Sequence, residues 1–167
     1  MTKEVKRNYL EITSLKDLKE SKKSFDGFSV VLLDPINFQL NKFFYKNVGK
    51  RHRWVDRLIW SEQEWIDYLS SSRVKTYVLK NKEDLIGFFE LIFHQEDKEV
   101  EIAYFGILEE YQNKKLGSFL LTSAIKNSFS ENTNRVWVHT CSLDHKNALN
   151  NYISRGMRIY KTESVSI

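Results

Sequence analysis

Three consecutive segments of the chain have the composition of β-strands and are separated by very short links. They are Lys75–Leu79, Asp84–Phe93 and Val100–Leu108, all rich in aliphatic and aromatic residues. The links, Asn81–Asp84 and Glu96–Lys98, are polar and typical of turns. Parallel strands need a crossover of about a dozen residues or more, so links this short predict antiparallel neighbours. We therefore expect an antiparallel sheet in the middle of the chain.

Further strands and helices are expected on both sides of this sheet. Strand-like segments occur at Tyr9–Thr13, Phe28–Leu33, Arg135–Cys141 and Met157–Lys161. Helical spacing of apolar residues, or a capping box, predicts helices over Ile36–Tyr45, Ser61–Tyr68, Leu116–Ile125 and Asp144–Tyr152. This order of elements predicts an α/β fold with a mixed, mostly antiparallel central sheet flanked by helices. A single domain is expected over residues 1–167, because the hydrophobic content of 41% provides a substantial core.

Composition narrows the choice of partners and of compartment. The formal charge is +4 and the isoelectric point is near 9.0, yet the lysines are scattered among acids. This distribution favours a small anionic ligand over nucleic acid. No apolar run is long enough to span a bilayer, and the charged amino terminus has no secretory pattern, so we expect a cytoplasmic protein without a membrane partner. The single cysteine, Cys141, suits a reducing compartment, and no metal site is expected. The sequence leaves a homodimer open.

The segment Ile107–Ser118 leaves a predicted strand, turns, and begins a predicted helix. The first amides of a helix have no partner within it, so a helix start attracts anions. Gly117 allows close approach of a ligand, while Lys114 and Lys115 add positive charge suited to a pyrophosphate. Without further context, an ordinary helix start with a solvated lysine pair explains this segment equally well.

Two motifs supply that context. Ile107–Ser118 resembles motif A of the GNAT N-acetyltransferases, written Gln/Arg-x-x-Gly-x-Gly/Ala, with Gln112 and Gly117 in place and Lys115 where the first glycine is expected. A later segment resembles the family pattern N-x-x-A-x-x-x-Y-x-x-x-G-F. Its matching residues are Ala148, Tyr152 and Gly156, with His145 for the asparagine and Met157 for the phenylalanine. From about Thr76 to its carboxyl end the chain thus resembles a GNAT acetyltransferase.

The resemblance implies that an acetyl group moves from acetyl-CoA, used as a cosubstrate, to a primary amine of a small molecule or peptide. It places the cosubstrate on the strand–loop–helix segment Glu101–Phe129. The residues expected to bind it are Phe105 and Ile107 through their backbone, together with Gln112, Asn113, Lys114, Lys115, Leu116, Gly117, Ser118 and His145.

Lys115 keeps a second interpretation open, because a lysine excludes or strains a glycine-only backbone conformation. In this interpretation the chain is a GNAT-fold module that binds or senses acyl-CoA without turnover. A third interpretation is a basic interaction protein whose loop only looks like the motif.

Direct transfer requires a base for the amine, donors for the oxyanion and an acid for the leaving thiolate. Glu101 has the spacing of the general base in the histone-acetyltransferase branch that the chain resembles, and Glu90, His139 and water are its rivals. Tyr152 matches the family tyrosine that protonates or hydrogen-bonds the coenzyme A thiolate; the alternative is an aromatic side chain at a helix–sheet seam. Cys141 is interpreted as a small buried residue and not as a nucleophile.

The acceptor site is expected where aromatic and charged residues gather in the first half of the chain, at Lys50–Arg57 and Trp60. This segment also resembles that of a bacterial GNAT subgroup of unassigned substrate. Trp54 and Trp60 either form the walls of an acceptor pocket or belong to the core. Arg57 either meets a charged group on the acceptor or anchors the local fold. Glu90 on a neighbouring strand is a further candidate for acceptor binding.

Overall fold

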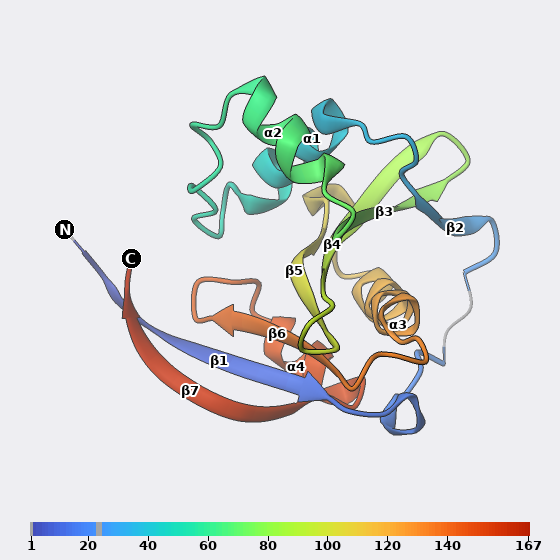
Figure 1. Cartoon of the computed structure of the whole chain (residues 1–167), viewed down its shortest axis with the longest axis vertical. Helices are drawn as coiled ribbons and strands as arrows, with labels where there is room; N and C mark the ends of the chain where they lie inside the picture. The colour runs from blue at the N-terminus through green and yellow to red at the C-terminus, as the bar shows by residue number, and fades with distance from the viewer. Residues whose placement is uncertain (1, 23–24) are drawn as a thin grey trace.

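The computed structural model describes residues 2–22 and 25–167, and its described strands form one seven-stranded sheet (Figure 1). The strands are β1 (Glu4–Ile12), β2 (Phe28–Leu32), β3 (Val74–Asn81), β4 (Asp84–His94), β5 (Glu99–Ile107), β6 (Arg135–Cys141) and β7 (Arg158–Ser166). Their order in the sheet is β2-β3-β4-β5-β6-β1-β7. All neighbours are antiparallel except β5 and β6, which are parallel. The predicted α/β fold with a mixed, mostly antiparallel sheet is confirmed.

The helices are α1 (Phe38–Gly49), α2 (Glu62–Ser70), α3 (Leu116–Ser128) and α4 (Ala148–Ser154), with short 3-10 turns at Leu15–Asp17 and Glu109–Tyr111. The capping box that predicts α2 is present: the Ser61 hydroxyl accepts from the Glu64 amide at 3.2 Å, and the Glu64 carboxylate accepts from the Ser61 amide. Over the described residues, no helix combines the length and the apolar character needed to span a membrane.

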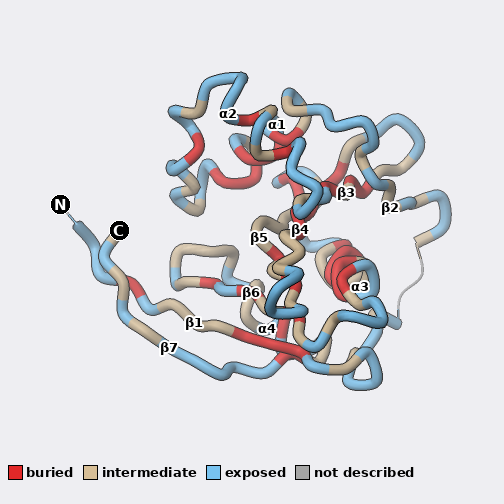
Figure 2. Tube along the Cα trace, in the orientation of Figure 1, coloured by how far each residue is buried: buried red, intermediate tan, exposed pale blue. Residues whose placement is uncertain are grey.

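The helices cover the sheet from both sides. The largest core cluster packs α3 and α4 against one face, with Leu120, Leu121 and Ala124 fully buried (Figure 2). Two smaller clusters pack α1 and α2 against the other face, over β3, β4 and β5. The part of the sheet formed by β6, β1 and β7 extends beyond α1 and α2, as Figure 1 shows.

The position of β1 differs from any arrangement expected from local patterns. It lies between β6 and β7, so that the two ends of the chain meet, and Lys3 and Ile167 exchange two backbone hydrogen bonds of 2.8 Å (Figure 1). β1 and β7 extend further toward the chain ends than predicted, with Glu4 paired to Ser166. Each of the two strands supplies hydrogen-bond partners for the other along its length. This pairing brings the first residues of the chain beside β6.

The parallel strands β5 and β6 separate after a short contact. Among the described residues their register holds from Glu99, opposite Arg135, to Glu101, opposite Trp137. Beyond that point β5 contains a bulge at Ala103, because Leu91 pairs with Ile102 whereas the adjacent Glu90 pairs with Tyr104. The edge of β5 that faces β6 is therefore open over its second half, next to the start of α3.

Candidate functional site

A cleft of about 1090 Å³ lies where β5 and β6 separate. It extends from the loop before α3, along the open edge of β5, to the charged side chains of β5, β6 and β1. The lining residues that bear on its function are Arg7, Trp54, Glu101, Tyr104, His139, Tyr152 and the stretch Gln112–Ser118 without Lys114. The structure thus brings most of the predicted site residues to one cavity.

The loop before α3 provides one end of the cleft. The Gln112 side-chain amide donates to the Ile107 carbonyl at 3.1 Å, and the Ser118 hydroxyl donates to the Lys115 carbonyl at 2.8 Å. These side chains hold the loop shape. As at any helix start, the first amides of α3 have no partners within the helix. The positive end of the α3 dipole also lies here, which favours an anion. Lys114 lies outside the cleft, with its ammonium 5.7 Å from the centre of the Tyr111 ring.

Lys115 adopts the left-handed backbone conformation that its position in the motif assigns to glycine, with φ 64° and ψ 15°. A lysine pays roughly 1–2 kcal/mol for this conformation. We expect Lys115→Gly to raise the free energy of unfolding by about 0.5–1 kcal/mol, because glycine's greater freedom in the unfolded chain offsets part of the relief. Urea unfolding measures the change. Asn113, also left-handed with φ 64°, is the control: asparagine tolerates this region, so Asn113→Gly should change stability less. Loss of stability in Lys115→Gly would contradict the strain.

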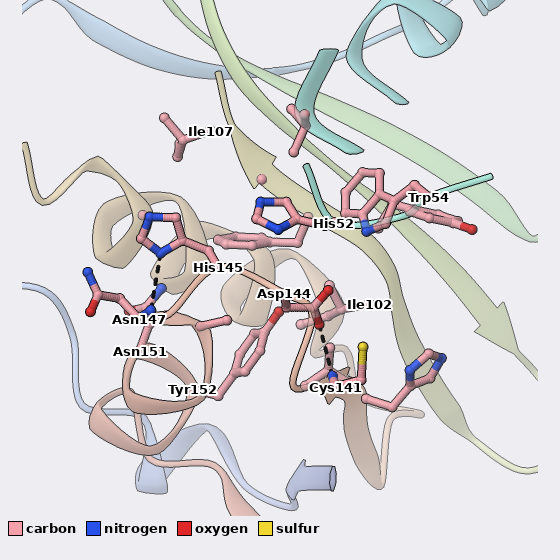
Figure 3. A pocket seen from close by; sticks show the side chains of 18 of the residues that line it. His52, Trp54, Ile102, Ile107, Cys141, Asp144, His145, Asn147, Asn151 and Tyr152 are labelled. Atoms are coloured by element: carbon pink, nitrogen blue, oxygen red, sulfur yellow. Dashed lines mark hydrogen bonds between the residues drawn. The ribbon is translucent and has the colours of Figure 1, made fainter. Parts of the chain in front are cut away.

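Tyr152 projects from α4 into the middle of the cleft, with its hydroxyl toward Asp144 (Figure 3). Its ring is 6.2 Å from the ring of Phe105 on β5. Burial, and then the negative charge of Asp144, raises the pKa of the Tyr152 phenol well above its ordinary value. Asp144 is itself held by the Cys141 amide, which donates to it at 3.0 Å, and by the Thr140 hydroxyl. The phenol therefore stays protonated throughout the neutral range.

Glu101 and His139 lie on the parallel strands and line the cleft where these strands separate. The Glu101 carboxylate is 3.0 Å from Nε2 of His94 at the end of β4, and the His94 ring stacks on Trp137. Burial, followed by the positive charge of Arg7, lowers the pKa of His139 below its ordinary value. His139 is consequently neutral at physiological pH and able to accept a proton.

Glu90 and Arg57 form a buried ion pair behind the cleft. Arg57 Nη1 donates to the two carboxylate oxygens of Glu90 at 2.9 and 3.1 Å, and the Asn41 amide donates to Glu90 at 3.2 Å. Glu90 is fully buried and Arg57 is 7% exposed. The rings within 5.7 Å of the guanidinium are those of Tyr45, Trp60, Trp65, Tyr68 and Tyr104.

The residues predicted to bind the acceptor do not all line the cleft. Trp54 lines the cleft and packs edge-on against Tyr104, with ring centres 4.9 Å apart. Arg57 also lines the cleft, but its guanidinium is bound in the ion pair with Glu90. Trp60 and Glu90 do not line it, among the residues that the structure describes. These two residues lie behind the wall of the cleft and support it.

His145 lies at the rim of the cleft, in the loop before α4. Its Nδ1 accepts the Asn147 amide at 3.1 Å (Figure 3), and its ring lies edge-on to that of His52, with ring centres 6.3 Å apart. His52 Nδ1 is 2.9 Å from the Leu143 carbonyl, so the loop after α1 is tied to the loop before α4. Burial, and then the neighbouring His52, lowers the pKa of His145.

Three residues that shape the chemistry of the cleft, Tyr104, Asp144 and Arg7, were not among the predicted site residues. Tyr104 lies upstream of both motifs, in a strand whose bulge no local pattern reveals. Asp144 has a sequence signal, since a carboxylate shortly after a strand commonly accepts nearby backbone amides. Arg7 has none, because it reaches the cleft only through the insertion of β1 beside β6.

Solved structures share this fold. A functionally unknown conserved protein from Staphylococcus epidermidis is 20% identical, with a TM-score of 0.65 over 98% of this chain and 61% of its own. A GCN5-related N-acetyltransferase from Kribbella flavida is 13% identical, with a TM-score of 0.67 over 96% of this chain and 56% of its own. An aminoglycoside acetyltransferase from a soil metagenome is 13% identical, with a TM-score of 0.66 over 78% of this chain and 88% of its own.

The chain spans only about 53–61% of the length of the first three structures that it resembles. No curated protein matches it at a significant level of sequence similarity. The model of the acetyltransferase (GNAT) family matches residues 38–157, which include both motifs and the whole of β5 and α3. With the motifs, the sheet and the cleft in agreement, the chain belongs to the GNAT family of acetyltransferases.

Proposed function

We propose that this protein transfers an acetyl group from acetyl-CoA to the primary amine of a small molecule or peptide by direct attack of the amine. The observation that carries the proposal is the continuous cleft between β5 and β6. A helix start with free amides forms one end of it, and two proton acceptors, Glu101 and His139, lie toward the other. An anionic, elongated thioester and an amine each find suitable groups there.

The cosubstrate is assigned to the end of the cleft near α3. The amides of Leu116, Gly117 and Ser118 and the positive end of the helix dipole suit its pyrophosphate. The open edge of β5 around Phe105 and Ile107 offers backbone groups to its extended arm, in the manner of an added strand. One of these N–H groups would polarise the acetyl carbonyl.

The proton transfers are assigned to side chains in the cleft. Glu101, directly or through water, accepts the proton of the attacking amine, and His139 is its rival. Tyr152, whose phenol is protonated at neutral pH, donates to the departing thiolate. Trp54 forms part of the acceptor wall. Arg57 is assigned the role of holding that wall in place through its ion pair with Glu90.

Two measurements test the proposal. Calorimetry with acetyl-CoA should show binding at micromolar to millimolar concentration, and the absence of binding would refute it. Thiol release in the presence of a panel of primary amines should then show turnover that depends on the amine.

The same pair of measurements addresses the alternative, a GNAT-fold module that binds acyl-CoA without turnover. Lys115 in place of the motif glycine favours this alternative, because the strained loop residue lines the cleft. Binding of acetyl-CoA with no thiol release against any amine would establish the binding module and refute the enzyme.

The role of Tyr152 predicts the behaviour of a conservative variant. We expect Tyr152→Phe to lower kcat about 10²-fold, because the leaving thiolate loses its proton donor, with little change in acetyl-CoA affinity. The ring contact with Phe105 is retained in this variant. Steady-state kinetics and calorimetry measure the two effects. Tyr77→Phe, which removes a hydroxyl on β3 outside the cleft, should leave kcat unchanged. A Tyr152→Phe variant with full kcat would show that Tyr152 only packs at the seam between helix and sheet.

A further inference from the structure

The acceptor end of the cleft contains a cation that the proposed reaction does not use. Arg7 on β1 lines the cleft together with Glu101 and His139. In the register of β1 and β6, Arg7 is opposite Cys141. Tyr9, the next residue of β1 on the same face of the sheet, is opposite His139. Arg7 and His139 are thus diagonal neighbours on the same face of the sheet, within reach of a long side chain. The charge of Arg7 acts on the imidazole of His139, in agreement with this placement.

The guanidinium of Arg7 is poorly satisfied within the protein. Its nearest acid is Glu163, at 3.9 Å from Nη1, which is the outer limit of an ion pair. The same Glu163 oxygen accepts the Tyr9 hydroxyl at 2.6 Å, and the other oxygen is 3.4 Å from the Lys161 ammonium. The Nε atom of Arg7 is buried, and nothing among residues 2–22 and 25–167 accepts a hydrogen bond from it. The side chain as a whole is 29% exposed, on the side of the cleft.

Arg57, the arginine that the sequence predicted for the acceptor wall, differs in this respect. Arg57 is saturated by Glu90 and surrounded by aromatic rings. A buried polar group without a partner is costly, and a guanidinium in this state is completed best by a carboxylate, which matches its donors in pairs. Arg7 therefore offers donors to a ligand that occupies the cleft, whereas Arg57 does not.

We propose that the acceptor of this protein carries a carboxylate close to its reactive amine, and that Arg7 binds this carboxylate. The inference rests on the function proposed above. Arg7 holds the acid group on β1, so that the amine of the same molecule is presented to Glu101 and His139 on the neighbouring strands. Amino acids and small amino-acid-like amines have this chemistry. Arg7 is a specificity-determining residue and takes no part in the transfer of the acetyl group.

Kinetics with matched acceptors test the proposal. Each acceptor is an amino acid, compared with its own α-carboxamide, in an assay of thiol release from acetyl-CoA. The wild-type protein should prefer the acid by about 10- to 100-fold in kcat/KM, because hydrogen bonds between two charged partners are lost in the amide. Arg7→Gln should bring the ratio of the two values close to one, mainly through a higher KM for the acid. Arg7→Lys, which keeps the charge and loses the paired donors, should give an intermediate ratio.

The control variant is Lys6→Gln on the same strand. Lys6 is exposed and its side chain points to the opposite face of the sheet, so this variant removes the same charge without altering the cleft. It should keep the wild-type preference. Equal turnover of acids and amides by the wild-type protein, or an unchanged preference in Arg7→Gln, would overturn the proposal.

A binding measurement distinguishes failure of this proposal from failure of the acetyltransferase itself. The ring of His139 is followed by NMR as a function of pH, with L-alanine or L-alaninamide present at high millimolar concentration. A carboxylate bound to Arg7 cancels part of the charge of Arg7, so alanine should move the His139 titration to higher pH. Alaninamide should not move it in the wild-type protein, and alanine should not move it in the Arg7→Gln variant. If neither alanine nor any other amino acid tested as a ligand shifts the His139 titration, the carboxylate site is overturned. A response to them without thiol release against any amine supports the site and refutes the enzyme.

Discussion

Replacement of Glu90 by glutamine is expected to lower the free energy of unfolding by about 3–5 kcal/mol, because it leaves the guanidinium of Arg57 buried without a counter-charge. Both partners are removed from water, and the two hydrogen bonds between them are 2.9 and 3.1 Å long. The aromatic rings around Arg57 offset only part of this cost, because a cation–π contact contributes on the order of 1–2 kcal/mol. Urea unfolding followed by tryptophan fluorescence measures the change.

A double variant makes this test specific. When Arg57→Leu is combined with Glu90→Leu, neither charge is left unpaired, so the double variant should be more stable than either single variant. Glu96→Gln provides the comparison at the surface. It removes the partner of Arg73 in an exposed ion pair, and such pairs contribute at most about 1 kcal/mol. A Glu90→Gln variant as stable as Glu96→Gln would mean that water reaches the Arg57 pair.

Replacement of Glu101 by glutamine is expected to lower kcat/KM for the amine by about 10²–10³-fold at neutral pH and to leave acetyl-CoA affinity unchanged. Glutamine keeps the shape of the side chain and can still hydrogen-bond His94, which is 3.0 Å away in the parent protein. The variant therefore removes the base and little else. Glu99→Gln is the matched control, since Glu99 precedes Glu101 on β5 by two residues, pairs with Arg135 and does not line the cleft.

The pH dependence of the rate distinguishes Glu101 from His139. A base is active only when deprotonated, so the rate falls as the pH falls through its pKa. Burial and the charge of Arg7 lower the pKa of His139, so a rate governed by His139 would decline at a lower pH than a rate governed by an ordinary histidine. Removing the charge in Arg7→Gln would then move the decline to higher pH. A Glu101→Gln variant that keeps a decline of the rate at low pH, together with this movement in Arg7→Gln, would assign the base to His139.

Local patterns predicted most of the fold. The helix α2 follows from a capping box at Ser61 that the structure contains, and β6 has the predicted bounds, Arg135 to Cys141. The short links of the middle strands led to the correct antiparallel pairing. These features depend on residues close together in the sequence, and that is the information which periodicity, turns and caps carry.

The remaining features depend on pairs of residues far apart in the chain. Nothing near Arg57 in the sequence indicates that its guanidinium is bound by Glu90, and nothing near Arg7 indicates that β1 is inserted between β6 and β7. Lys115 is an intermediate case. The motif predicts a glycine there, and the structure shows that the chain keeps the left-handed conformation although the residue has changed.

The cleft is built from two kinds of atoms, and this division bears on how acceptor choice can diverge. The half assigned to the cosubstrate uses the backbone of β5 and the first amides of α3, which every substitution except proline leaves in place. The half assigned to the acceptor uses the side chains of Arg7, Trp54 and His139, each replaceable by one substitution. Acceptor preference can therefore change, in evolution or by engineering, without rebuilding positions 102–118. A library confined to the acceptor-side positions is the economical starting point for retargeting this protein.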